Sequence, residues 1–193
     1  VMIHDEKSAG IFIAPGHHGR IIMDSYWKAG EPCPIAISAG HHPVFLFAGS
    51  FSLPPRVPEY NYVGSVLHER IPVVTGRLTG LPLPVFSEIV LEGFLFPNEL
   101  KSEGKFGEWP GYYVSDARPE PVIQVKAVYY RNDPIILGAW PGRPPHDSTY
   151  RHSIIKSANL WDLLERARIG GITGVYRPES GAANLLTLIS LKQ

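Results

Sequence analysis

Residues 122–130 read VIQVKAVYY, and this stretch is the clearest indication of the fold class. β-Branched and aromatic side chains such as Val122, Ile123 and Tyr129 are favoured in strands, because they fit a half-buried pleated surface. Residues 88–96, EIVLEGFLF, alternate in part between apolar and polar and predict a second central strand. The two stretches together predict a domain built around a β-sheet.

On either side of these strands, short apolar runs are separated by proline and glycine, with 19 residues of each type. This punctuation is typical of a β-rich domain with many turns. Residues 20–28 instead predict a helix that ends at Gly30. Residues 43–48 fit either a strand or a short helix, and the proline-interrupted residues 54–64 predict a segment that follows the surface. Further strands are expected at residues 1–3, 10–14, 34–39 and 71–78.

The character of the chain changes after residues 134–140. Residues 152–168 predict a long helix ended by Gly170 and Gly171, followed by strands at 172–176 and 185–191. We therefore expect a boundary near Tyr150, with one domain at residues 1–150. Residues 151–193 would be a linker helix and the start of a second, incomplete α/β domain.

The composition narrows the class of protein. The chain has 18 basic and 18 acidic residues, so nothing in its charge indicates a nucleic acid or an anionic membrane as partner. A single cysteine, Cys33, excludes an internal disulfide framework and predicts a reducing, cytoplasmic location. No apolar run has the length of a membrane span, and a chain that begins at Val1 without an initiator methionine is expected to be a segment of a longer protein.

Residues 102–113, SEGKFGEWPGYY, hold two carboxylates, Glu103 and Glu108, in a glycine-rich loop. Their spacing does not fit one face of a helix, where neighbours are three or four positions apart. Two carboxyl groups in different environments can hold different protonation states, as proton transfer requires. The loop is therefore a catalytic candidate, and the alternative from composition alone is a solvated acidic turn.

A second candidate is the loop PGHHGR at residues 15–20, which leads into the expected helix. Histidine is a common metal ligand, and a helix N-terminus favours phosphate. Adjacent histidines do not readily point at one ion, so at most one of His17 and His18 is expected to bind. Glu59 could complete a site for Mg²⁺ or Mn²⁺, or it could be an ordinary surface glutamate.

These stretches resemble the UbiD family of reversible decarboxylases, which use prenylated flavin mononucleotide. The most specific phrases are SEIVLEG at residues 87–93 and EGKFGEWPGY at residues 103–112. Shorter matches are HD at 4–5, GIFIAPGHHGR at 10–20, GEPCP at 30–34, YVG at 62–64 and GRPP at 142–145.

The resemblance implies an α+β, mainly β fold: a split β-barrel that holds the flavin, then a linker helix and the start of an α/β domain. It implies that Glu108 is the catalytic acid/base and that Glu103 pairs with a catalytic arginine. His17 and Glu59 would bind the divalent metal, Mn²⁺ or Mg²⁺, that holds the flavin phosphate, with K⁺ nearby. Gly16, His17, Phe51, Ser52 and Glu59 would contact the cofactor.

Three departures from the family pattern accompany this resemblance. The family's asparagine ligand and its arginine would precede Val1 and so lie outside this chain. Lys105 stands where many members have proline, and could lower the pKa values of Glu103 and Glu108. Gly16 stands where some members have a polar flavin contact.

The function implied is the reversible, non-oxidative decarboxylation of an aromatic or α,β-unsaturated carboxylic acid, with CO₂ as co-product. A flavin prenyltransferase would supply the cofactor, and the full-length protein is expected to be a homo-oligomer. The alternatives are a non-catalytic, flavin-binding barrel subunit and a metallohydrolase that uses histidine and glutamate.

Overall fold

The computed structural model describes residues 1–49, 53, 57–105, 107, 111–113, 116–138 and 142–192. The chain divides into two compact units: residues 1–103 with 118–137, and residues 104–117 with 138–193.

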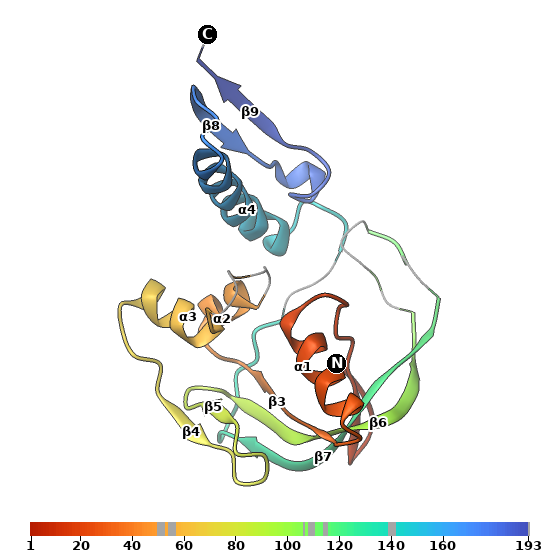
Figure 1. Ribbon diagram of the computed structural model, residues 1–193. Helices are drawn as coiled ribbons and strands as arrows, with labels where there is room; N and C mark the ends of the chain where they lie inside the picture. Colours follow the sequence, from red (N-terminus) through yellow and green to blue (C-terminus); the bar gives the residue numbers. More distant parts are fainter. Residues whose placement is uncertain are drawn as a thin grey trace. The chain divides into compact units, whose positions relative to one another are not determined.

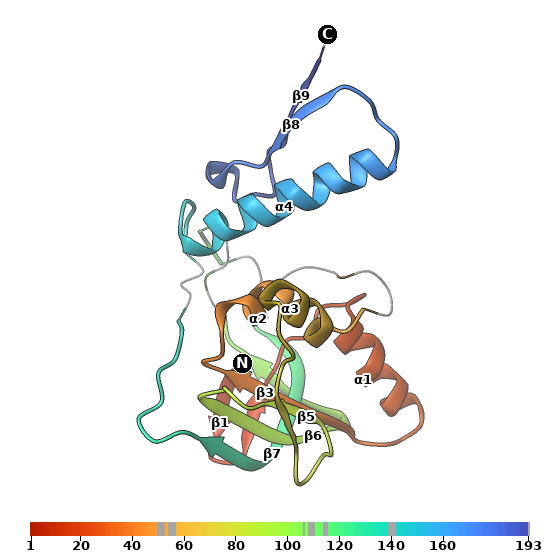
Figure 2. The same ribbon diagram turned by 90° about the vertical axis from the view of Figure 1, so that its left-hand side faces the viewer.

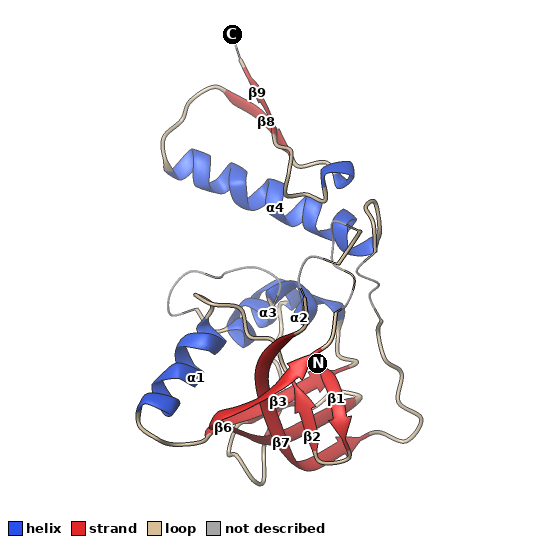
Figure 3. Ribbon diagram, turned by 90° about the vertical axis from the view of Figure 1, so that its right-hand side faces the viewer, coloured by secondary structure: helices blue, strands red, loops and turns tan. Residues whose placement is uncertain are grey.

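The first unit is organised around a five-stranded antiparallel sheet with the strand order β1-β2-β7-β6-β3. Figure 1 labels β3, β6 and β7 of this sheet, and Figure 3 labels all five strands. Its long central pair consists of the two strands that the sequence indicates most clearly, now seen to extend further. The described strands leave β1 and β3 as edges and do not close on themselves. The strands are β1 (Met2–Asp5), β2 (Ser8–Gly10), β3 (Cys33–Ala39), β6 (Ile89–Glu103) and β7 (Arg118–Tyr130).

The β6–β7 pairing is interrupted by bulges that follow Glu92 and Leu95. At the first bulge Gly93 lies so close to β7 that a Cβ atom there would approach the carbonyl oxygen of Gln124 to 2.1 Å. A glycine is required at this point because the two backbones come together.

Helix α1 (His18–Lys28) packs on the sheet, as Figure 3 shows. The core beneath it is formed by Met23, Cys33, Leu95 and Ile123, each at most 4% exposed. The indole Nε1 of Trp27 donates to the carbonyl oxygen of Leu95 at 3.0 Å, which fixes the helix against β6. The burial of the Cys33 thiol also raises its pKa.

Two short helices, α2 (Pro43–Ala48) and α3 (Glu59–Leu67), pack side by side over a second small core of Val44, Ala48 and Val63 (Figure 2). The backbone N–H of Val44 donates to Nδ1 of His42 at 3.3 Å, which caps α2 and settles the ambiguity between strand and helix. From Glu59 onward, the expected surface segment over residues 54–64 is helical, with only Val63 of residues 59–64 buried. Pro58 occupies the N-cap position of a helix.

Other sequence-based boundaries also shift. The expected strand at 10–14 ends at Gly10, and the one at 71–78 is reduced to β4 (Val73–Thr75), which pairs with β5 (Pro82–Pro84). The loop of this hairpin is held by Glu92, whose carboxylate accepts from the backbone N–H groups of Leu78 and Thr79.

The second unit contains α4 (Asp147–Arg166), a 3-10 turn (Glu179–Gly181) and the hairpin of β8 (Ile172–Tyr176) and β9 (Leu188–Leu191). Helix α4 begins earlier than residue 152, because Thr149 Oγ1 accepts from the His146 N–H at 2.8 Å and caps the first turn. Among the described residues, no helix combines the length and the apolar character needed to cross a bilayer. Taken together, the strands and helices of the two units make the chain mainly β with few helices, as expected.

Candidate functional site

A cavity of about 230 Å³ lies where helices α1 and α3 begin and α2 ends. Residues 16–19 form one wall, Ala48 and Gly49 a second, and Glu59 a third. All of these residues belong to the first unit. The helix N-termini direct unpaired backbone N–H groups and a partial positive charge towards this region, which favours an anion such as phosphate.

The sequence around Gly16 explains the shape of this wall. Gly16 has φ +80°, a left-handed conformation that glycine adopts without strain. His17 is extended at the N-cap position of α1, and His18 is the first helical residue. The two histidines are adjacent in sequence but occupy different backbone conformations.

His18 is the histidine that the structure brings to Glu59. Its Nδ1 atom lies 3.7 Å from Oε1 of Glu59, and both side chains are about half exposed. His17 lines the same cavity. Within the described part of the chain, no ion pair within 4 Å joins His17 to Glu59.

The His18–Glu59 pair offers one imidazole nitrogen and one carboxylate oxygen, a donor set that suits Mn²⁺ or Mg²⁺. The described residues contain no group of three histidine, cysteine, aspartate or glutamate side chains that could hold a metal ion. The pair therefore fits as two ligands of a shell whose remaining donors come from elsewhere.

Glu103 is the last residue of β6 and lies opposite Arg118 in the β6–β7 register. It is 7% exposed, so its carboxyl group is nearly enclosed. Arg118 is engaged elsewhere: its Nε is 2.6 Å from Oε1 of Glu120, and its guanidinium group lies 4.4 Å from the ring centre of Phe12. Among the described residues, Glu103 has no cationic partner within 4 Å.

Glu108, Phe51 and Ser52 lie outside the described residues, so their expected roles stay predictions. In the described part of the loop, Gly107 and Tyr113 form an antiparallel bridge. Lys105 Nζ lies 2.5 Å from Oδ1 of Asp116. This ion pair gives the lysine a carboxylate partner that the sequence analysis did not identify.

Sequence reasoning also missed the role of Glu92. This residue has no exposed surface, and its Oε1 accepts from the backbone N–H groups of Leu78 and Thr79 and from Thr79 Oγ1. Its Oε2 accepts from the Tyr129 hydroxyl at 2.7 Å. Burial raises the pKa of this carboxyl group, but the hydrogen bonds from Thr79, Tyr129 and Leu78 outweigh that effect, and the pKa is lowered. The sequence signal that could have identified this role is the position of Glu92 within the otherwise apolar run IVLEG at residues 89–93.

Comparison with known proteins decides the family. Residues 1–144 match the UbiD family, described as the 3-octaprenyl-4-hydroxybenzoate carboxy-lyase Rift-related domain. The chain belongs to the UbiD family. The resemblance drawn from the sequence motifs is thereby confirmed.

UbiD relatives with similar sequences are named as decarboxylases. The chain is 33% identical over 167 residues to pyrrole-2-carboxylic acid decarboxylase of Pseudomonas aeruginosa, covering 86% of this chain and 34% of the relative. It is 33% identical over 198 residues to ferulic acid decarboxylase 1 of Saccharomyces cerevisiae, covering 100% of this chain and 39% of the relative.

The fold is also similar to that of solved UbiD-class enzymes. An evolved dimeric form of HmfF from Pelotomaculum thermopropionicum, in complex with prFMN, superimposes with a TM-score of 0.89 at 27% identity. The match covers 98% of this chain and 43% of that one. This chain thus spans well under half the length of the relatives it matches.

Proposed function

We propose that this chain is the flavin-holding part of a UbiD-type enzyme that reversibly decarboxylates an aromatic or α,β-unsaturated carboxylic acid. The observation that carries the proposal is the His18–Glu59 pair, which lines a cavity at two helix N-termini in a chain of this family. Helix N-termini favour a phosphate, and the pair supplies donors for a metal ion beside it.

The prenylated flavin mononucleotide would be held through its phosphate. We assign one metal ligand to His18 rather than to His17, because His18 is the histidine that lies 3.7 Å from Glu59. The metal would be Mn²⁺ or Mg²⁺, with a K⁺ ion nearby and the remaining donors from residues outside this chain. Gly16, Phe51 and Ser52 stay proposed cofactor contacts.

When bound, the cofactor supplies an electron sink for the electron pair left as the substrate loses CO₂. The side chains of the protein would then orient the substrate acid and transfer one proton. Glu108 delivers its carboxyl proton to the carbon that carried the carboxylate and regains a proton from solvent, so the net change exchanges CO₂ for hydrogen. Glu103, which is enclosed at the end of β6, would orient an arginine from outside this chain.

Several finer points belong to the same proposal. The sheet would be part of a split barrel, with residues 1–150 as the flavin-binding domain and residues 151–193 as the start of the next. A flavin prenyltransferase would supply the cofactor, and the full-length protein would assemble as a homo-oligomer in the cytoplasm.

The proposal is tested by separating turnover from cofactor binding in the full-length protein. Glu108→Gln should keep the bound flavin but reduce decarboxylation of cinnamic- and hydroxybenzoic-type acids by about a hundredfold or more, since the proton donor is lost. Glu69→Gln, at an exposed position, is the matched control and should keep full activity. Normal turnover in Glu108→Gln would overturn the assignment of the acid/base.

A further inference from the structure

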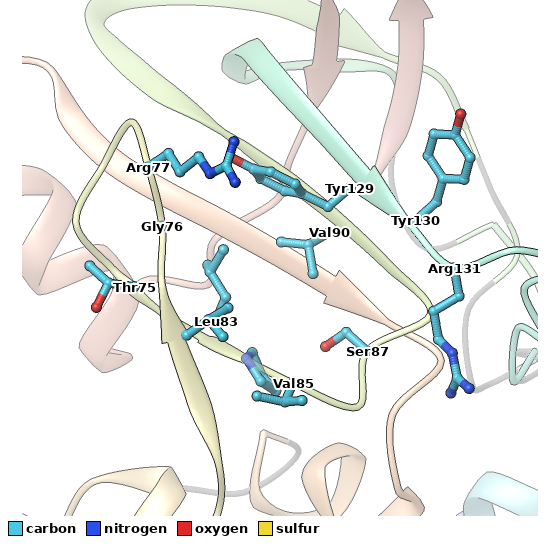
Figure 4. Close-up of a pocket in the computed structure, with 12 residues that line it drawn as sticks. Thr75, Gly76, Arg77, Leu83, Val85, Ser87, Val90, Tyr129, Tyr130 and Arg131 are labelled. Carbon is cyan, nitrogen blue, oxygen red and sulfur yellow. The ribbon is translucent and has the colours of Figure 1, made fainter.

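A second cavity, of about 490 Å³, lies between the β4–β5 hairpin and the paired strands β6 and β7 (Figure 4). Its volume is in the range of small-molecule sites. It shares no lining residue with the cavity of His18 and Glu59. The proposed decarboxylation leaves this second cavity without a role.

The walls are mainly apolar. Leu83 from β5 and Val90 from β6 are buried, whereas Val74 and Val85 show 53% and 44% of their surface. Aliphatic side chains from three strands therefore present a surface that a ligand's apolar body would cover. Removing such surface from water is favourable.

Ser87 contributes an unsatisfied polar group to this cavity. The residue is 7% exposed, and its Oγ atom is fully enclosed without a hydrogen-bond partner in the described part of the chain. Figure 4 shows the hydroxyl directed towards the side of the cavity formed by Leu83 and Val85. Buried hydroxyl groups in proteins are nearly always hydrogen-bonded, so this one indicates a missing partner.

Two arginines line the cavity, and they differ in their partners. Arg131 Nη1 lies 2.9 Å from Oε1 of Glu88, so its charge is compensated. Arg77 is exposed, and its charge acts on the nearby Tyr129 hydroxyl, which donates to Glu92. The described residues contain no ion pair between Arg77 and a carboxylate within 4 Å. In Figure 4, Val90 is drawn between Arg77 and Ser87, so the two polar groups stand at separate places around an apolar middle.

We propose that this cavity binds a small carboxylic acid with an apolar body. Its carboxylate would pair with the Arg77 guanidinium group, since arginine binds carboxylates through paired hydrogen bonds. Its apolar body would cover Leu83 and Val90, and a polar atom would hydrogen-bond to Ser87 Oγ. The site is separate from the proposed catalytic centre and does not depend on the flavin.

The test uses the full-length protein and fluorophenylacetate as probe, observed by fluorine NMR. Arg77→Gln should weaken binding about tenfold, because a charge-assisted pair is lost. Ser87→Ala should weaken it less, by roughly threefold. Arg131→Gln is the matched control and should bind within about twofold of the unmodified protein, because its charge is already compensated.

The uncharged amide of the same probe should bind the unmodified protein about as weakly as the acid binds Arg77→Gln. If Arg77→Gln and Arg131→Gln weakened binding of the acid equally, the acid would be attracted by the positive charge of the surface in general. That result would overturn the proposal. Unchanged binding in both Arg77→Gln and Ser87→Ala would place the acid elsewhere. A crystal soaked with the acid that shows only ordered water on Ser87 would also overturn it.

Discussion

The Nδ1 atom of His18 lies 3.7 Å from Oε1 of Glu59, and this contact joins the first residue of α1 to the first residue of α3. The two residues come from separate segments of the chain and meet only because both helices begin at the same cavity. The pair combines a nitrogen and an oxygen donor with two helix N-termini, an arrangement suited to a metal-bound phosphate.

The two adjacent histidines should therefore differ in their effect on the metal. His18→Ala should lower metal affinity about tenfold or more and reduce the flavin that co-purifies, because a direct ligand is lost. His17→Ala should retain most of both. Metal analysis and flavin absorbance of the two purified full-length variants provide the measurement, and a larger loss in His17→Ala would reverse the assignment.

Glu92 should be a major contributor to stability. Glu92→Ala leaves the donors of Leu78, Thr79 and Tyr129 unpaired in a buried place and should cost roughly 3 kcal/mol or more. Tyr129→Phe removes only one of these hydrogen bonds and should cost about 1 kcal/mol. Denaturant unfolding of both variants measures the difference, and equal small losses would contradict the role assigned to Glu92.

The same carboxyl group should make stability depend on pH. Its native pKa is lowered from the ordinary value of 4.5, so its contribution is fully present above that value. The contribution is lost as the pH falls from 4.5 through the lower native pKa. Glu92→Gln should therefore lose less stability than the unmodified protein over this acidic range. Parallel pH profiles of the free energy of unfolding would contradict this expectation.

Gly93 should not tolerate a side chain. Gly93→Ala would place a Cβ atom 2.1 Å from the backbone oxygen of Gln124, and separating β6 from β7 should cost about 2 kcal/mol or more. Gly170→Ala is the control, because no atom lies within 4 Å of the added carbon and its φ is not positive. Thermal unfolding should show a clear fall in Tm for Gly93→Ala alone.

The sequence predicted the central elements because their patterns are long. The apolar runs of the sequence correctly predict the positions of β3, β6 and β7. Gly30 correctly predicts where helix α1 ends. Helix α3 was missed because the prolines before it suggest an irregular segment. A proline at the N-cap position loses no helical hydrogen bond, however, so Pro58 begins the helix rather than preventing it.

The sequence predicted the loops of the candidate site, and its assignment of His17 and Glu59 as metal ligands stays a prediction beside the His18–Glu59 contact of the structure. The pattern PGHHGR indicated a ligand site, but the choice between His17 and His18 depends on which residue is the N-cap, a detail within the usual error of helix boundaries. Arg77 gave no signal, and Ser87 belongs to the family phrase SEIVLEG without being indicated as a binding residue, because their cavity exists only once the β4–β5 hairpin packs beside β6 and β7. Local sequence patterns do not predict which distant segments pack against each other in this way.

We propose above all that this chain holds a prenylated flavin in a decarboxylase. The most direct test is to produce the full-length protein together with a flavin prenyltransferase and to identify the released ligand by mass spectrometry. We expect prenylated flavin mononucleotide, bound together with a divalent metal. A protein that carries metal but no flavin, or only unmodified flavin mononucleotide, would contradict it.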